Sequence, residues 1–392
     1  MLIGCFQVQM IRTNKSRWPV FLLLLSVAAL LFLPHSFITS AQKRTSQRTP
    51  SRPKASPTPT PSALDALGPP PPAPTLRQKH EEQEVTPGDV ISVNTTEVMI
   101  PVTVRDENGR LVNELTRKDF KVFENDREQP LSDLALRQVP VDVILMVDAS
   151  SSVATNLDDF RRAADGFAER LSEEDRISLI KFDDRVELLQ DWTHSRFQLR
   201  RALGRIEPGM FTRFNDALLL AAQEQFGDTK SRRAVIILSD GIDSGRGSAT
   251  LEAAVQALLR AQVSVYVVSN TEISRAAKRA ELDSLTGGSD AAVRFNQLRI
   301  DDLRTGLRVL DLSEQMLAQL TATTGGKLYK PQSFAGLEST YAEVAEELRH
   351  QYALYYTPLN KARDGGFRRV RVEMTNPAYT SHTRVGYFAP KS

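Results

Sequence analysis

The sequence predicts an α/β protein whose main domain is a doubly wound, mainly parallel sheet with helices on both faces. Between residues 139 and 350, apolar runs typical of strands alternate with segments of helical spacing, which is the order of strand–helix–strand units. The run that ends at Asp148 is apolar almost throughout, as expected for a strand buried on both faces. These observations place one α/β domain at residues 139–350.

Within that domain the predicted strands and helices follow one another in order. Strands are expected at residues 141–148, 176–182, 233–240 and 263–269, and helices at residues 157–171, 216–226, 250–261, 312–323 and 336–348. Residues 270–308 are charged and too long for a simple connection, so we interpret them as an insertion near the same rim. The sequence leaves the structure and role of that insertion open.

Segments with strand-like patterns flank the α/β domain on both sides. In residues 89–138, Val98, Ile100, Val102 and Val104 alternate with other residues, and a second strand-like run with a turn follows. Residues 351–392 contain three further runs, at 352–358, 368–374 and 383–389. Neither segment has enough strands to be stable alone. We therefore expect the two segments to pair into one small β-sandwich, with the α/β domain inserted between its halves.

The first 88 residues have the composition of an export signal and a linker. Arg12, Lys15 and Arg17 precede the apolar residues 18–33, and small residues up to Ala41 complete the order of a secretory signal peptide at residues 1–41. The apolar part is short for a bilayer span, which needs about 20 residues, so an uncleaved anchor is the alternative. Residues 42–88 are rich in proline and predict a disordered, extended tether. We expect an exported protein that is periplasmic, secreted or on the cell surface.

Composition excludes two classes of function. With 50 Lys and Arg against 48 Asp and Glu, the formal charge is only +2, which gives no reason to expect a nucleic-acid partner. Contact with a membrane is expected only through an uncleaved anchor. Cys5 is the one cysteine and lies in the leader, so the mature chain is expected to use neither disulfides nor thiol chemistry.

Five oxygen-bearing side chains fall where predicted strands or loops meet one edge of the sheet. Asp148, Ser150 and Ser152 occupy alternate positions after the first strand, Thr212 precedes a predicted helix, and Asp240 ends another strand. Small oxygen ligands on tight loops suit a hard divalent cation, because Mg²⁺ requires octahedral oxygen coordination. The expected cofactor is therefore Mg²⁺, with Mn²⁺ or Ca²⁺ as alternatives.

The strings DASSS, TRFNDA and LSDGID, in this order, resemble the von Willebrand factor type A domain and its metal-ion-dependent adhesion site. The resemblance covers residues 139–350. The flanks LVNELTRKDFKVFEND and QYALYYTP also look like those of bacterial exported proteins related to this family, of the acidobacterial type. Met210 and Phe211 depart from the family pattern, in which many members have glycines before the threonine.

The resemblance implies a fold, a metal site and a non-enzymatic function. It assigns the metal to Asp148, Ser150, Ser152, Thr212 and Asp240, with one coordination position left for an Asp or Glu carboxylate of a protein partner. It also implies that binding can shift the last helix of the domain, here at residues 336–348. The function expected is adhesion-type protein binding, and the identity of the partner and the oligomeric state are left open.

Two other functions remain as alternatives. A structural or assembly factor of the cell envelope would use the same fold as a scaffold. A serine hydrolase would use Ser150, Ser151 or Ser152 as its nucleophile, but the sequence has no G-x-S-x-G turn, and His194, His350 and His382 are scattered.

Several polar motifs have structural explanations. For Asp148, Ser150 and Ser152 the alternative is a capping loop at a helix start. Asp183 and Asp184 are expected to mark a turn, and Asp243 to be a loop or capping residue.

Overall fold

The computed structural model describes residues 97–136, 139–150, 156–226, 231–391 of the chain. The predicted signal peptide and the proline-rich linker, residues 1–88, lie outside these residues. Among the helices within the described ranges, none is both long and apolar enough to span a bilayer.

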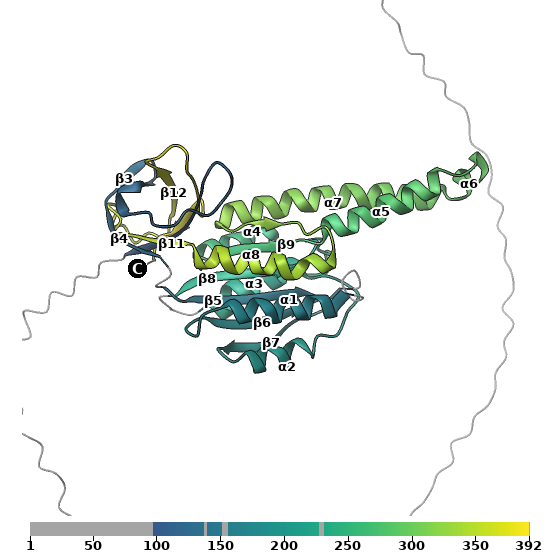
Figure 1. The fold of residues 1–392 in the computed structure, drawn as a ribbon, viewed down its shortest axis with the longest axis horizontal. Helices are drawn as coiled ribbons and strands as arrows, with labels where there is room; N and C mark the ends of the chain where they lie inside the picture. Colours follow the sequence, from purple (N-terminus) through teal and green to yellow (C-terminus); the bar gives the residue numbers. More distant parts are fainter. Residues whose placement is uncertain (1–96, 137–138, 151–155, 227–230, 392) are drawn as a thin grey trace, which may run out of the picture. The chain divides into compact units, whose positions relative to one another are not determined.

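The α/β domain is built on a six-stranded sheet with the strand order β10-β9-β8-β5-β6-β7 (Figure 1). Only the edge strand β7 runs antiparallel to its neighbour in this sheet. Every residue of the central strand β5 is buried, because helices cover both faces. The strands are β5 (Val141–Asp148), β6 (Arg176–Phe182), β7 (Val186–Thr193), β8 (Arg232–Leu238), β9 (Ser264–Val268) and β10 (Leu328–Tyr329).

Alternate residues of β5 point into two different apolar cores. Val143 and Leu145 pack with α1, α2 and α8 on one face, whereas Ile144 and Met146 pack with α3, α4 and α7 on the other. A π-helical turn, Ala221–Gln225, extends α3, and a 3-10 turn, Phe334–Gly336, precedes α8. The covering helices are α1 (Leu157–Arg170), α2 (Arg196–Leu203), α3 (Phe214–Leu220), α4 (Leu251–Arg260), α7 (Gln297–Thr324) and α8 (Leu337–Arg349).

The predicted insertion forms a helical hairpin. Helix α5 (Thr271–Thr286) leaves the sheet directly after β9, α6 (Asp290–Phe295) makes the turn, and α7 returns to the sheet. Figure 1 shows α5 and the first part of α7 running side by side beyond the edge of the sheet. The predicted helix at residues 312–323 is therefore only the C-terminal part of α7, since the insertion extends the same helix toward its N-terminus.

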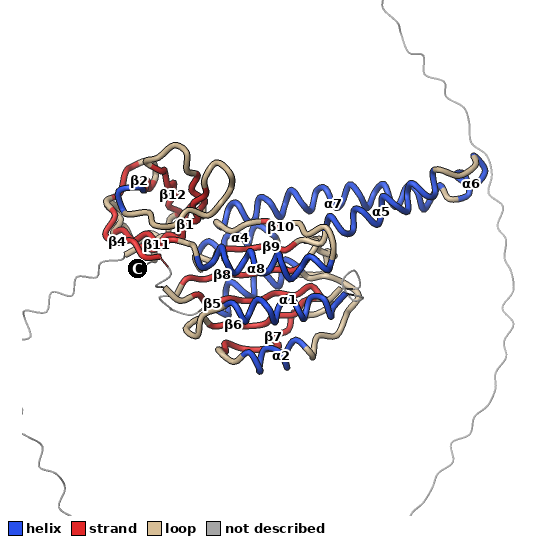
Figure 2. Tube along the Cα trace, viewed as in Figure 1, coloured by secondary structure: helices blue, strands red, loops and turns tan. Residues whose placement is uncertain are grey.

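The N-terminal and C-terminal segments share two four-stranded sheets, as Figure 2 shows in red beside the α/β domain. One sheet has the order β13-β1-β11-β4 and the other β14-β12-β2-β3, so each combines strands from both ends of the chain. Apolar residues between them form a third core. A 3-10 turn, Arg117–Asp119, precedes β2. The strands are β1 (Val98–Arg105), β2 (Phe120–Glu124), β3 (Arg127–Gln129), β4 (Leu131–Leu136), β11 (Tyr352–Tyr356), β12 (Phe367–Met374), β13 (Thr380–His382) and β14 (Gly386–Phe388).

Buried charged groups join the β-sandwich to the α/β domain. The Glu347 carboxylate, near the end of α8, is 2% exposed and forms an ion pair with Arg105 at the end of β1. The buried Arg384 guanidinium donates to the Met99 carbonyl oxygen at 2.6 Å and to the Gln262 side chain at 2.9 Å. Because a buried charge is stabilised only while its partners stay in place, these contacts hold the two parts together.

The predicted fold class is confirmed: a mostly parallel six-stranded sheet is flanked by helices and accompanied by antiparallel sheets. The details differ in two places. Of the predicted strand at residues 383–389 only β14 forms, and β13, just before it in the chain, belongs to the other sheet. The edge strand β7, most of whose residues are half-buried or exposed, and helix α2 were not predicted.

Candidate metal centre

Two aspartates lie at the carboxyl ends of neighbouring parallel strands. Asp148 is the last residue of β5, and Asp240 follows the end of β8. Strands β5 and β8 pair in register up to Val147 and Leu238, so both side chains meet the same edge of the sheet. This edge is where open α/β sheets bind ligands.

The Asp148 carboxylate is completely buried and held at both oxygens. Its Oδ1 accepts the Ser150 backbone N–H at 2.9 Å, and its Oδ2 accepts the Ser239 hydroxyl at 2.7 Å. The Ser239 Oγ in turn accepts the Gly241 backbone N–H at 2.9 Å. Asp148 therefore connects its own loop to the loop that carries Asp240.

Burial disfavours the ionised forms of both aspartates. Burial, and after it the charge of Asp240, raise the pKa of Asp148 from its ordinary value of 3.8 to about 6, although the hydrogen bonds from Ser150 and Ser239 act in the opposite direction. Burial also raises the pKa of Asp240, partly offset by the Ile242 backbone N–H and the Lys278 charge. Within the described residues neither carboxylate forms an ion pair, so a cation at this edge would offset the cost of ionising both.

Thr212 lies on the same edge, on a loop that is tied to both aspartate loops. Its backbone N–H donates to the Ser244 Oγ at 2.8 Å, and the Ser244 N–H donates back to the Thr212 carbonyl oxygen at 2.9 Å. The Gly209 N–H donates to the Ala149 carbonyl oxygen at 2.8 Å. Thr212 is 7% exposed. The three predicted motifs are thus linked by hydrogen bonds between their loops.

Asp184 holds the part of this loop that departs from the family pattern. Its carboxylate accepts the backbone N–H groups of Met210, at 3.0 Å, and Phe211, at 3.2 Å. The guanidinium of Arg246 makes a cation–π contact with the Phe211 ring, with its central carbon 3.7 Å from the ring centroid. Met210 is 75% exposed. The bulky pair therefore forms an outward-facing rim beside Thr212, and the loop is fixed by a carboxylate where glycines are common in the family.

Asp183 and Asp243 both have structural roles. As predicted, Asp183 and Asp184 lie in the turn between β6 and β7, and the buried Asp183 forms an ion pair with Lys181 at 2.8 Å. Asp243 accepts the backbone N–H groups of Asn215, at 2.9 Å, and Gly245, at 2.7 Å, as expected of a loop and capping residue.

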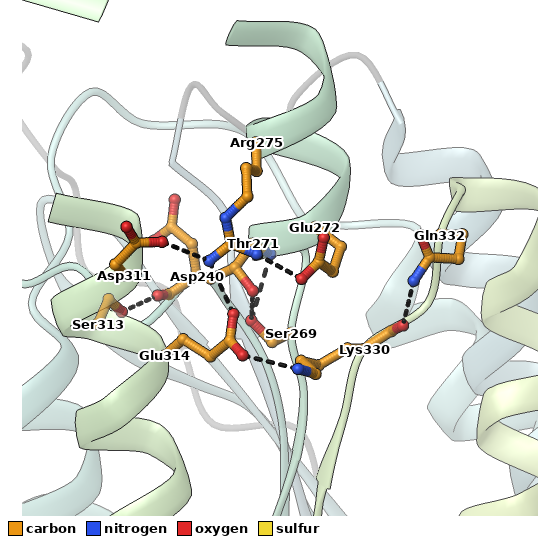
Figure 3. A network of polar contacts seen from close by, with 10 residues as sticks. All are labelled: Asp240, Ser269, Thr271, Glu272, Arg275, Asp311, Ser313, Glu314, Lys330 and Gln332. Carbon is orange, nitrogen blue, oxygen red and sulfur yellow. Dashed lines mark hydrogen bonds and ion pairs between the residues drawn. The ribbon is translucent and has the colours of Figure 1, made fainter. Parts of the chain in front are cut away.

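The base of the helical hairpin packs directly on the Asp240 loop (Figure 3). The Ser313 hydroxyl of α7 donates to the Asp240 carbonyl oxygen. Gly241 has a φ of +73°, and a Cβ at this position would lie 2.7 Å from the Leu317 side chain. Only glycine fits this close approach and this backbone conformation. The position of Asp240 therefore depends on α7 as well as on the sheet.

A buried arginine fixes the hairpin itself at this base. The Arg275 guanidinium donates to the carboxylates of Glu272, Asp311 and Glu314, which come from both long helices (Figure 3). Glu314 also accepts the Lys330 ammonium at 2.7 Å. These contacts hold α5, α7 and the segment after α7 in one arrangement above the metal edge.

The predicted ligands fit a hard cation as far as they are described. Asp148 and Asp240, which carry carboxylates, and Ser150 and Thr212, which carry hydroxyls, lie on loops and strand ends at one edge of the sheet. Ser152 lies outside the described residues. Within the residues that the structure describes, no three His, Cys, Asp or Glu side chains form a group able to hold a metal ion, and a site with two carboxylates does not need such a group.

Sequence reasoning missed three residues that position the site. Ser239 lies beside Asp240 within a recognised motif, so its hydrogen bond to Asp148 could have been suspected. Asp184 was interpreted only as a turn residue, although its carboxylate faces a distant loop. Ser313 carries no signal in the sequence, because its contact with the Asp240 carbonyl depends on how the hairpin packs.

The comparison with known families agrees with the geometry of this edge. Residues 143–242 match the model of the von Willebrand factor type A domain, and this stretch contains the motifs of both aspartates and of Thr212. Residues 143–242 are therefore similar to a von Willebrand factor type A domain. No protein among the curated ones matches the chain.

Solved structures with a similar fold come from animals and bacteria. Proximal thread matrix protein 1 from the mussel byssus, described with a zinc-occupied MIDAS motif, is 15% identical, with 58% of this chain and 50% of that chain covered and a TM-score of 0.40. This chain thus spans about half the length of the mussel protein.

Two bacterial structures show similar relationships. The vWF domain of the type V pili tip protein Mfa5 from Porphyromonas gingivalis is 24% identical, with 27% of this chain and 39% of that chain covered and a TM-score of 0.25. A von Willebrand factor type A structure from Catenulispora acidiphila is 11% identical, with 76% and 75% covered and a TM-score of 0.39.

Proposed function

We propose that this chain is an exported, non-enzymatic binding protein whose von Willebrand factor type A domain holds a divalent cation and binds a carboxylate of a protein partner. The observation that supports this most is the pair of buried aspartates, Asp148 and Asp240. Each carries a raised pKa, and neither has an ion-pair partner among the described residues. A buried carboxylate without an ion-pair partner is costly to ionise, so a site of this kind is best explained by a bound cation.

In this proposal one group of residues binds the cation and a second group positions the loops that carry them. Asp148, Ser150, Thr212 and Asp240 would hold the cation, together with Ser152, which lies outside the described residues. The cation would supply a positive charge for a partner's Asp or Glu carboxylate in a partly dry site. Ser239, Asp184 and Ser313 keep the three loops in place. Mg²⁺ fits these oxygen donors best, and Mn²⁺ or Ca²⁺ are the alternatives.

The contacts of the histidines support a function in recognition over catalysis. His194, His350 and His382 each place a ring nitrogen at a backbone carbonyl oxygen, at 3.0, 2.8 and 2.6 Å. His194 contacts Asp175 at the amino end of β6, opposite the metal edge, and the other two lie after α8 and on β13. A serine hydrolase would need a base beside its nucleophile. Failure of a fluorophosphonate probe to label the protein would support the proposal further.

Calorimetry with Mg²⁺, Mn²⁺ and Ca²⁺ tests the metal site directly. We expect the wild-type chain to bind one divalent cation and Asp148→Ala to bind none. Asp165→Ala is the matched control, because this partly exposed aspartate of α1 is paired with Arg200 of α2 and its ion pairs lie away from the metal edge. Binding that is unchanged in Asp148→Ala would contradict the assignment of the ligands.

Partner binding is tested separately, since a metal that only stabilises the fold would satisfy calorimetry as well. We expect an envelope extract to yield a protein captured in the presence of Mg²⁺ and released by a chelator, and lost with Asp148→Ala. If metal binds but capture does not depend on it, the domain acts as a scaffold, and the structural or assembly function replaces the adhesion-type function.

A further inference from the structure

Helix α7 has apolar residues on two opposite sides. The inner side, with Ile300, Leu303 and Leu310, is buried within the hairpin. The outer side is exposed to solvent, and we call it the α7 outer stripe. Its apolar members, together with the last residue of α6, are Phe295 at 90%, Leu298 at 83%, Val309 at 38% and Leu312 at 66% exposed. A helix with a polar outer face needs no second partner, whereas this one leaves a second apolar stripe uncovered.

The stripe has the spacing of a coiled-coil seam. Within α7, Leu298, Asp302, Thr305, Val309 and Leu312 follow the alternating three- and four-residue steps of a heptad repeat. Phe295 continues this spacing along the sequence from α6, on the other side of the turn at Asn296, and all six residues are exposed. The polar members, Asp302 and Thr305, lie in the middle, with apolar residues on both sides. The order of apolar and polar positions is therefore the same when the stripe is followed from either end.

We propose that the α7 outer stripe pairs with the same stripe of a second copy of the chain, in antiparallel orientation. In this register Leu298 faces Val309 of the second copy and Asp302 faces Thr305, while Phe295, at the end of α6, lies nearest to Leu312. Two-fold symmetry repeats each contact, as in most homodimers. The apolar layers lie at both ends of the seam, and the polar layer at its centre fixes the register.

Charges beside the stripe support a second copy as the partner. Asp301 and Arg308 flank the stripe on the same side, and the antiparallel register places each opposite the other on the second copy. Both are exposed, and their contacts are local: Arg308 donates to the Thr305 hydroxyl at 2.9 Å, and Asp301 accepts the Gln297 amide at 3.0 Å and forms an exposed ion pair with Arg304 at 3.7 Å. In a parallel pairing Asp301 would lie near Gly306 of the second copy, which supplies no counter-charge. The charge pattern is thus complementary to itself only in antiparallel orientation.

Pairing of this kind would join two binding domains through rigid arms. The stripe ends at Leu312, next to Ser313, whose hydroxyl holds the Asp240 loop. A dimer would present two metal edges, so binding to a repeated partner would gain from avidity. The proposed dimer does not rest on metal binding, because none of the stripe residues belongs to the metal site.

Charge reversal tests the pairing in the full-length chain. We expect sedimentation velocity to show a dimer for the wild type, and a dissociation constant raised about tenfold or more for Asp301→Arg or Arg308→Asp, since like charges then meet twice. The double variant Asp301→Arg with Arg308→Asp should restore the dimer. Two single variants with different tags should form a mixed dimer. Asp283→Arg, an exposed position on α5 outside the stripe, is the matched control.

Each other result overturns the proposal. A monomeric wild type, including one whose stripe is covered by its own N-terminal segment, excludes a second copy as the partner. A dimer that neither single reversal weakens is held together elsewhere, for example by the apolar leader. A dimer weakened by the single reversals but not restored in the double variant or the mixture contradicts the antiparallel register. Circular dichroism of every variant checks that the hairpin remains helical.

Discussion

Replacing Asp148 with Asn should stabilise the metal-free protein while abolishing its response to metal. The pKa of this carboxyl is raised from 3.8 to about 6 in the folded chain, so ionising it at neutral pH costs the fold about 3 kcal/mol. The folded state binds the proton more tightly than the unfolded state. The stabilising effect is therefore complete below about pH 4 and is lost as the pH rises through about 6. An amide at this position does not ionise, so the variant avoids this loss.

The structure shows that an amide can be accommodated. In Asp148→Asn the amide oxygen can still accept the Ser150 N–H, and the Ser239 hydroxyl can turn to accept from the amide nitrogen. We expect a gain of about 1–3 kcal/mol at pH 7.5 in the presence of chelator, measured by urea unfolding. The gain should shrink toward zero at pH 4. Asp165→Asn, on the surface of α1, should change stability little at either pH.

Metal binding should depend on the same titration of Asp148, because the cation binds the ionised carboxylate and the proton competes with it. A carboxyl with a pKa of about 6 is only about one-tenth ionised at pH 5, so the affinity for Mg²⁺ should fall about tenfold between pH 7.5 and pH 5. Calorimetry in buffers of different ionisation enthalpy would detect the released protons. The reasoning is refuted if Asp148→Asn is no more stable than the wild type at pH 7.5 without metal, or if the Mg²⁺ affinity does not change with pH.

Three further substitutions test the contacts around the site. Asp184→Ala leaves the Met210 N–H without its acceptor and should cost about 1 kcal/mol in urea unfolding and weaken Mg²⁺ binding several-fold; unchanged calorimetry would show that this loop does not position the site. Ser313→Ala removes the donor to the Asp240 carbonyl and should also weaken Mg²⁺ binding, whereas an effect on stability alone would limit Ser313 to packing. Glu347→Ala breaks a buried ion pair and should lower the free energy of unfolding by about 2–4 kcal/mol; a loss below 1 kcal/mol would show that this pair does not join the β-sandwich to the α/β domain.

The sequence predicted best where a residue's environment depends on its neighbours along the chain. The apolar run before Asp148 predicted the central strand with the observed bounds, because burial on both faces requires apolar residues in succession. In the N-terminal β segment, a period-two pattern of apolar residues placed Val98, Ile100, Val102 and Val104 on the buried face of β1. Both patterns reflect which faces of a single strand are buried and which are exposed to solvent.

Contacts between distant elements were beyond this reasoning. Asp184 was expected to serve only its turn, yet it also holds the loop before Thr212. Residues 270–308 were recognised as an insertion, but whether they formed helices could not be decided, because much of α5 and α7 is polar and stabilised by ion pairs such as that of Arg275 with Glu314. Contacts between side chains far apart in the sequence produce no periodic pattern in either segment, so the sequence does not reveal them.

The amino-acid sequence by itself predicted the alternation of strands and helices, the pairing of two terminal β segments, and the candidate ligands Asp148, Ser150, Ser152, Thr212 and Asp240, of which Ser152 lies outside the described residues. Strand ends and loops are local features, and parallel strands bring their carboxyl ends to one edge, so these residues could be assigned together. Only the tertiary structure decided how that edge is held: by Ser239 from the next strand and by Ser313 from the hairpin. The free energies of these contacts depend on distances between segments far apart in the chain, and those distances exist only in the folded protein.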